Sequence, residues 1–129
     1  MLEYDHDGEL CTNGDTTEEG VVAALSSFDG ATSFYCALAD NGTAEAICCY
    51  GDPDRRLLEV GPFGATRVLA HDVTEGEQRV EVSLSAEERV AVPEREVFSL
   101  AECVEVMRHW RRTHEAPAHL VELPKSYRS

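Results

Sequence analysis

Cysteine and histidine are the residue types in this chain that could serve as nucleophiles or metal ligands, and each occurs five times. A cysteine nucleophile needs a histidine and an orienting acid within reach. Cys48 and Cys49 lie in an apolar run, and Cys103 recurs with apolar residues at helical spacing, so we expect all three to be buried. Cys11 precedes turn residues and should be the most exposed. An odd number of cysteines with one adjacent pair is no disulfide framework, so we predict free thiols in a reducing compartment.

A zinc site requires cysteines and histidines at close, repeated spacing. His109 and His114 are five residues apart and would point to different faces of a helix, while His6 and Cys11 are the nearest approach to a ligand pair. We therefore predict no metal, no cofactor and no catalytic residue. An enzyme or ligand-binding protein with an unrecognised pocket inside its sheet stays as an alternative.

The charge of the chain is the strongest sequence signal. Its 129 residues include 25 Asp and Glu but 11 Lys and Arg, which gives a net charge of -14. Such an anion repels phosphate groups, so we predict no direct contact with nucleic acid or membrane. Residues 1–66 hold 13 acids and two bases, whereas residues 67–129 hold 12 acids and nine bases. The acidic half suits a basic partner, although acidity can also serve solubility alone.

Candidate contacts with such a partner are acids in predicted loops and at strand ends. They are Asp5, Asp7, Glu9, Asp52, Asp54 and Glu59. Trp110 is a candidate anchor, but its spacing from Leu100, Cys103 and Met107 also fits the packed face of a helix.

These residues are expected to lie in one domain spanning residues 1–129, because the length suits a single core and 43% of the residues are hydrophobic. No apolar run approaches the ~20 residues of a membrane span. The first seven residues are acidic, whereas a secretory signal begins with basic residues followed by an apolar stretch. We therefore predict no secretory signal and expect a cytoplasmic protein.

Hydrophobic periodicity predicts two helices, at residues 17–28 and 100–114. Capping boxes should begin both helices, one formed by Thr16 with Glu19 and the other by Ser99 with Glu102. Strands are predicted at residues 2–10, 32–39, 44–50, 56–60, 66–73, 78–84, 90–92 and 118–123.

The predicted connections define the fold class. Asn41-Gly42 should turn one hairpin, and Glu75-Gly76 should join strands 66–73 and 78–84 in another. The tail, residues 125–129, should be loose. The order indicates an α+β fold, an antiparallel β meander with an N-terminal and a C-terminal helix packed on one face.

The helix opening at Thr16-Thr17-Glu18-Glu19, the strands with glycine-bounded turns and the segment 96–123 together resemble a known family. They are similar to the immunity proteins of bacterial polymorphic toxin systems, in the family commonly encoded beside nucleic-acid deaminase toxins. The resemblance covers nearly the whole chain and rests on element order and periodicity.

The resemblance implies an antitoxin without catalytic residues. Such a protein would bind its cognate toxin and occlude the basic cleft in which a deaminase holds its substrate. A small acidic adaptor with another basic partner is the alternative.

Overall fold

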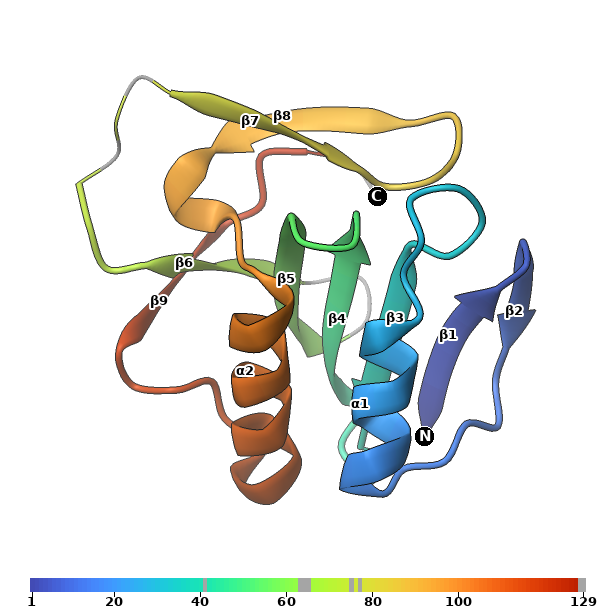
Figure 1. Cartoon of the computed structure of the whole chain (residues 1–129). Helices are drawn as coiled ribbons and strands as arrows, with labels where there is room; N and C mark the ends of the chain where they lie inside the picture. The colour runs from blue at the N-terminus through green and yellow to red at the C-terminus, as the bar shows by residue number, and fades with distance from the viewer. Residues whose placement is uncertain (41, 63–65, 75, 77, 128–129) are drawn as a thin grey trace.

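The computed structural model describes residues 1–40, 42–62, 66–74, 76 and 78–127 (Figure 1). No helix of this described part is long and apolar enough to cross a membrane. The elements are β1 (Leu2–His6), β2 (Glu9–Cys11), α1 (Glu18–Ser26), β3 (Tyr35–Ala39), β4 (Glu45–Gly51), β5 (Arg56–Pro62), β6 (Arg67–His71), β7 (Arg79–Ser83), β8 (Arg89–Pro93), a short 3₁₀ helix (Glu94–Glu96), α2 (Leu100–Thr113) and β9 (Leu120–Pro124).

The large sheet has seven antiparallel strands in the order β2-β1-β3-β4-β5-β6-β9. Its strands β3 to β6 follow one another along the chain, so each pairs with the next. α1 connects β2 to β3, and β9 returns at the end of the chain to pair with β6. The fold is therefore α+β with an antiparallel meander, as the sequence predicts.

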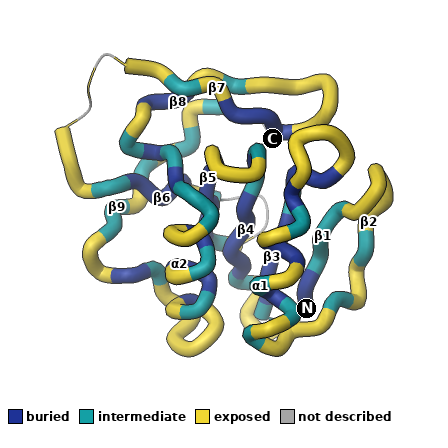
Figure 2. The backbone as a smooth tube through the Cα atoms, in the orientation of Figure 1, coloured by how far each residue is buried: buried dark blue, intermediate teal, exposed yellow. Residues whose placement is uncertain are grey.

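Both helices cover one face of this sheet (Figure 1). The main core lies between the two helices and this face of the sheet. It includes Leu25 of α1, Ile47 and Leu58 of the sheet, and Met107 of α2. The opposite face is partly covered by the β7–β8 hairpin, which forms a second sheet and a smaller core around Leu57. Figure 2 shows the buried segments concentrated in the large sheet and at the faces of the helices that pack on it.

α2 follows directly from local sequence. Ser99 accepts a hydrogen bond from the Glu102 N–H, and Glu102 accepts one from the Ser99 N–H, so the predicted capping box is present. Met107 and Trp110 lie on the buried face of the helix. The helix ends where His114 adopts a left-handed conformation with φ of 57°.

The predicted hairpin of residues 66–73 and 78–84 is wrong. β6 pairs with β5 and β9, while β7 pairs with β8. Alternation along a strand shows that one face is exposed but does not identify the neighbouring strand. Two predicted turn residues, Asn41 and Glu75, lie outside the described residues.

Three other local predictions need correction. The expected strand 2–10 is a hairpin, because Asp7 and Gly8 both have positive φ and turn the chain between β1 and β2. The N-cap of α1 is Thr17 rather than Thr16, and its hydroxyl accepts from the Gly20 N–H. The described part of the tail is docked, since Lys125 pairs with Glu59 and Tyr127 packs on the smaller core.

Candidate functional site

Three loops meet at one end of the large sheet, which we call the acidic end. They are the β1–β2 turn, the α1–β3 loop and the β4–β5 turn, all on the upper side of Figure 1. The Gly8 N–H donates to the Thr32 carbonyl at 3.1 Å, and a Cβ placed on Gly30 would lie 3.5 Å from Pro53 Cδ. The carboxylates of this end are those of Asp5, Asp7, Asp29, Asp52 and Asp54.

Two of these carboxylates fix the α1–β3 loop. Asp5 accepts hydrogen bonds from the backbone N–H groups of Phe34 and Tyr35, at 2.8 to 2.9 Å. Asp29 accepts from three consecutive N–H groups, and these bonds, with the one from Thr32 foremost, hold its pKa well below its usual range. Asp29 therefore stays ionised. Asp29 is not among the acids predicted as contacts, although Asp-Gly after a helix is a turn signal.

The β4–β5 turn is tied to its neighbours in the same way. Asp52 accepts from the Ser83 N–H at 3.1 Å and Asp54 from the Leu100 N–H at 3.0 Å. These bonds join the turn to β7 and to the start of α2. Both predicted contact residues thus have a structural role, and their charges are held in fixed positions.

Asp7 and Glu9 are the exposed acids of the β1–β2 hairpin, at the free edge of the sheet. Asp7 lies 3.4 Å from the ring of its neighbour His6, a pair that is largely solvated. Unlike Asp5, these side chains do not tie one loop to another within the described residues. They can contact a partner without disturbing the fold.

The side chains of Glu59 and Trp110 are buried, so neither is available to contact a partner. Glu59 is 2% exposed, in the middle of β5, and its carboxylate lies 3.2 Å from Lys125 Nζ. Trp110 is 3% exposed, belongs to the main core and stacks on the His114 ring at 5.0 Å. The expectation of an exposed Glu59 is wrong, because the tail covers it, and Trp110 has the packed role that its helical spacing also allowed.

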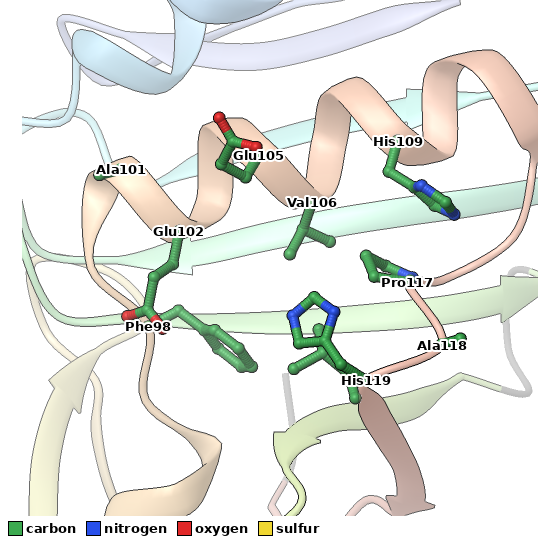
Figure 3. A pocket seen from close by; sticks show the side chains of 10 residues that line it. Phe98, Ala101, Glu102, Glu105, Val106, His109, Pro117, Ala118 and His119 are labelled. Carbon is green, nitrogen blue, oxygen red and sulfur yellow. The ribbon is translucent and has the colours of Figure 1, made fainter.

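A second feature is a groove of about 740 Å³ beside α2, which we call the α2 groove (Figure 3). Ala101, Glu102, Glu105 and His109 line it along the helix, and residues 117–119 form the opposite wall. Phe98 and Val106 lie beneath it and are buried in the core, so its accessible apolar surface comes from Ala101, Ala118 and Leu120. Its size is within the ~300–1,000 Å³ of ordinary ligand sites. No local sequence motif marks this groove, because its two walls come from α2 and from the segment that follows the helix.

A histidine–glutamate pair lies at the end of this groove. His71 Nδ1 is 3.0 Å from the Arg95 carbonyl oxygen, and its Nε2 is 2.6 Å from Glu102 Oε2. A carbonyl oxygen only accepts, so the ring is placed to donate from Nδ1 to Arg95 while its Nε2 edge faces the Glu102 carboxylate. Partial burial raises the pKa of Glu102, but hydrogen bonds from Ser99 and His71 outweigh it and the net shift is downward. The pair links β6 to the start of α2.

The cysteines are free thiols, as predicted, and four of them are buried. Burial raises the pKa of Cys48 to about 12 and also raises that of Cys36. The pKa of Cys103 is raised by its hydrogen bond with Cys49, whose Sγ is 3.8 Å away, and by burial. These thiols are poor nucleophiles, because the thiolate is the reactive form. Cys11 is the least buried.

No family model and no curated protein matches the sequence. Within the described ranges, no group of three or more His, Cys, Asp or Glu side chains is placed to hold a metal ion. The function must therefore be argued from the two features above, the acidic end and the α2 groove.

Proposed function

We propose that this chain is an immunity-type binding protein that neutralises a basic protein toxin, of the class that deaminates nucleic acid. In this proposal the acidic end occupies the toxin's substrate cleft. The observation that carries it is the meeting of three acid-bearing loops at one end of the sheet. A hydrogen bond joins the β1–β2 turn to the α1–β3 loop, and the β4–β5 turn is bonded to β7 and to the start of α2.

Charge complementarity supports this function. An enzyme that acts on nucleic acid needs a positively charged channel for phosphates. Asp5, Asp29, Asp52 and Asp54 are fixed by backbone N–H groups, so their negative charges are positioned before a partner arrives. Fixed charges lower the ordering cost of association, and the excess of acids in residues 1–66 favours rapid encounter with a basic surface.

The test uses the toxin encoded next to this chain's gene. Co-expression should relieve the toxin's growth arrest, and the purified proteins should bind each other. The variant Asp7→Lys/Glu9→Lys changes an exposed acid of the acidic end and an exposed acid beside it, and should slow association about tenfold at ~0.1 M salt. Raising the salt to ~1 M should reduce the difference, because the Debye length falls from ~10 Å to ~3 Å.

The matched control is Glu94→Lys/Glu115→Lys. It changes the net charge equally but alters two exposed acids outside the three loops. Equal slowing by both variants would show that only total charge matters and would remove the acidic end from the interface. Binding without relief of growth arrest would favour an acidic adaptor over an antitoxin. Failure to bind the toxin at all would refute the proposal.

A further inference from the structure

Arg56 is the largest fully buried side chain of the described residues, and its guanidinium bonds no carboxylate there. Nε donates to the Asp52 carbonyl at 3.1 Å, and Nη2 donates to the Pro53 carbonyl at 2.9 Å. Nη1 has no hydrogen-bond partner within the described part of the chain. A buried arginine is ordinarily paired with an acid, because an uncompensated charge in the interior is costly. Stability alone would favour an apolar side chain at this position.

Two aromatic residues fix the position of this guanidinium. The Arg56 N–H donates to the Phe98 carbonyl at 2.9 Å, and the Phe98 N–H donates to the Arg56 carbonyl at 2.8 Å. The backbone of Arg56 is thus held against the segment that leads into α2. At the other end of the side chain, the guanidinium carbon lies 3.9 Å from the centre of the ring of Phe28, a buried residue that follows α1. The planar fork of the guanidinium therefore meets the β4–β5 turn from a fixed position inside the core.

The β4–β5 turn presents the carboxylates of Asp52 and Asp54 at the surface of the acidic end. Each of these two carboxylates accepts one hydrogen bond from a backbone N–H of a neighbouring segment, whereas that of Asp29 accepts three. The arrangement of the turn therefore depends more on what holds its backbone. The Arg56 fork bonds the carbonyls of its first two residues.

We propose that Arg56 is a positioning residue of the acidic end. Its guanidinium holds the backbone of the β4–β5 turn from inside, so that Asp52 and Asp54 keep one arrangement in the free protein. The use that a partner makes of this turn rests on the proposed function, but the ordering of the turn is measurable without a toxin. This role accounts for a buried charge that the packing of the core does not require.

Amide hydrogen exchange, measured by NMR on the purified protein, tests the ordering of the turn. Arg56→Met fills a similar space without the fork and should speed exchange of the Asp52 and Ser83 N–H groups about tenfold, because the Arg55 carbonyl and the Asp52 carboxylate that they bond belong to the turn. Arg56→Lys keeps the charge but not the fork, so its effect should be about threefold. The N–H groups of residues 104–110, inside α2, are the internal reference and should change less than about twofold.

Val21→Ala is the matched control. Val21 is buried in the main core near the start of α1, at the end of the sheet away from the acidic end (Figure 1), and its loss should speed exchange at the reference groups as much as at the turn. Equal acceleration at both places in Arg56→Met would show that Arg56 acts on overall stability alone. No acceleration at the turn would show that the fork does not hold it. Either result would overturn the inference, and Arg56→Lys supplies the same comparison if circular dichroism shows Arg56→Met unfolded.

Binding to the toxin tests the use made of the turn. Arg56→Met should weaken binding about fivefold, because the turn must then be ordered on contact, and Val21→Ala should weaken it less than about twofold. Asp52→Asn/Asp54→Asn keeps acceptors for the two N–H groups but lacks the charges, so adding Arg56→Met to it should weaken binding less than about twofold further.

The outcomes separate this role from the proposed function. If the parent protein binds the toxin, an unchanged affinity in Arg56→Met would overturn the positioning role. So would a full fivefold loss on adding Arg56→Met to Asp52→Asn/Asp54→Asn, because the effect would then not pass through these carboxylates. If the chain binds no toxin, the proposed function fails, while the exchange rates still decide whether Arg56 orders the turn.

Discussion

Lys125→Ala should destabilise the protein far more than its place near the chain end suggests. Its Nζ lies 3.2 Å from one oxygen of Glu59 and 3.3 Å from the other. Glu59 is only 2% exposed, and the Lys125 side chain is 18% exposed. Tyr127 adjoins the pair, and burial together with the Glu59 carboxylate raises its pKa. Removing the lysine therefore leaves a carboxylate in the interior without its cation.

The size of the effect follows from this burial. Removing one partner of a buried ion pair costs about 3–5 kcal/mol. Because Lys125 retains some exposure, we expect about 3 kcal/mol for Lys125→Ala. Glu59→Gln removes the charge and leaves a lysine that can reach water, so it should cost about 1 kcal/mol. In Glu59→Gln/Lys125→Ala no charge is stranded, and the double variant should be more stable than Lys125→Ala by at least about 1 kcal/mol.

Urea denaturation followed by circular dichroism measures these free energies of unfolding. A loss of about 3 kcal/mol corresponds to a melting temperature lower by roughly 10 °C for a domain of this size. Arg89→Ala is the control, because it removes a 3.9 Å pair with Glu81 in which both side chains are 69% exposed, and it should cost less than about 1 kcal/mol. A loss below about 0.5 kcal/mol in Lys125→Ala, or single losses that simply add in the double variant, would refute the reasoning.

Three further predictions concern the helix cap, an ionised loop residue and the thiols. Ser99→Ala should lower the free energy of unfolding by about 1 kcal/mol in urea denaturation, because it removes the N-cap of α2. Asp29→Asn should be less stable than the parent at pH 7. Since the folded-state pKa of Asp29 is depressed, this difference should shrink in denaturation curves recorded below about pH 4. With a thiol reagent at pH 8, Cys11 should react first, while Cys48 and Cys103 should react only as the protein unfolds, which mass spectrometry of labelled peptides can check.

The elements that could be predicted from the sequence are those with local causes. α2 needs only its 3.6-residue periodicity and the hydrogen bonds between Ser99 and Glu102. The β1–β2 hairpin has a local signal in Asp7-Gly8, which favours a turn, but the alternation of apolar residues across this pair also fits a single strand. The partner of β6 could not be inferred locally, since it is β9, about fifty residues further along the chain.

Local sequence also gives no indication that the charged residues of β5 are buried. Arg56 is 0% exposed: its guanidinium donates to the Asp52 and Pro53 carbonyls and lies 3.9 Å from the centre of the Phe28 ring. Glu59 is buried by the tail. Charged residues in a strand suggest that at least one face of the strand is exposed. Arg56 and Glu59 face opposite sides of the sheet, and both are buried because distant segments of the chain cover them.

The candidate site was predicted in part. Asp5 and Asp52 were expected in acidic loops, and the structure brings their loops to the same end of the sheet. Their hydrogen bonds to Phe34 and Ser83 could not be predicted, because each joins segments about thirty residues apart. The α2 groove has no motif of its own, since its walls come from two separate segments, α2 and residues 117–120.

The order of strands in the large sheet gives the molecule a permanent electric dipole. Strands β1 to β5 come from residues 1–66 and lie side by side from the β2 edge, and β6 and β9 follow at the other edge. The part of the sequence with a net charge of -11, against -3 for residues 67–129, therefore supplies the β2 side of the sheet. In the field of a cationic surface this dipole produces a torque that turns the more negative side forward before any atoms touch. The succession of strands along the chain thus sets the orientation in which the molecule arrives, independently of the shape of either surface.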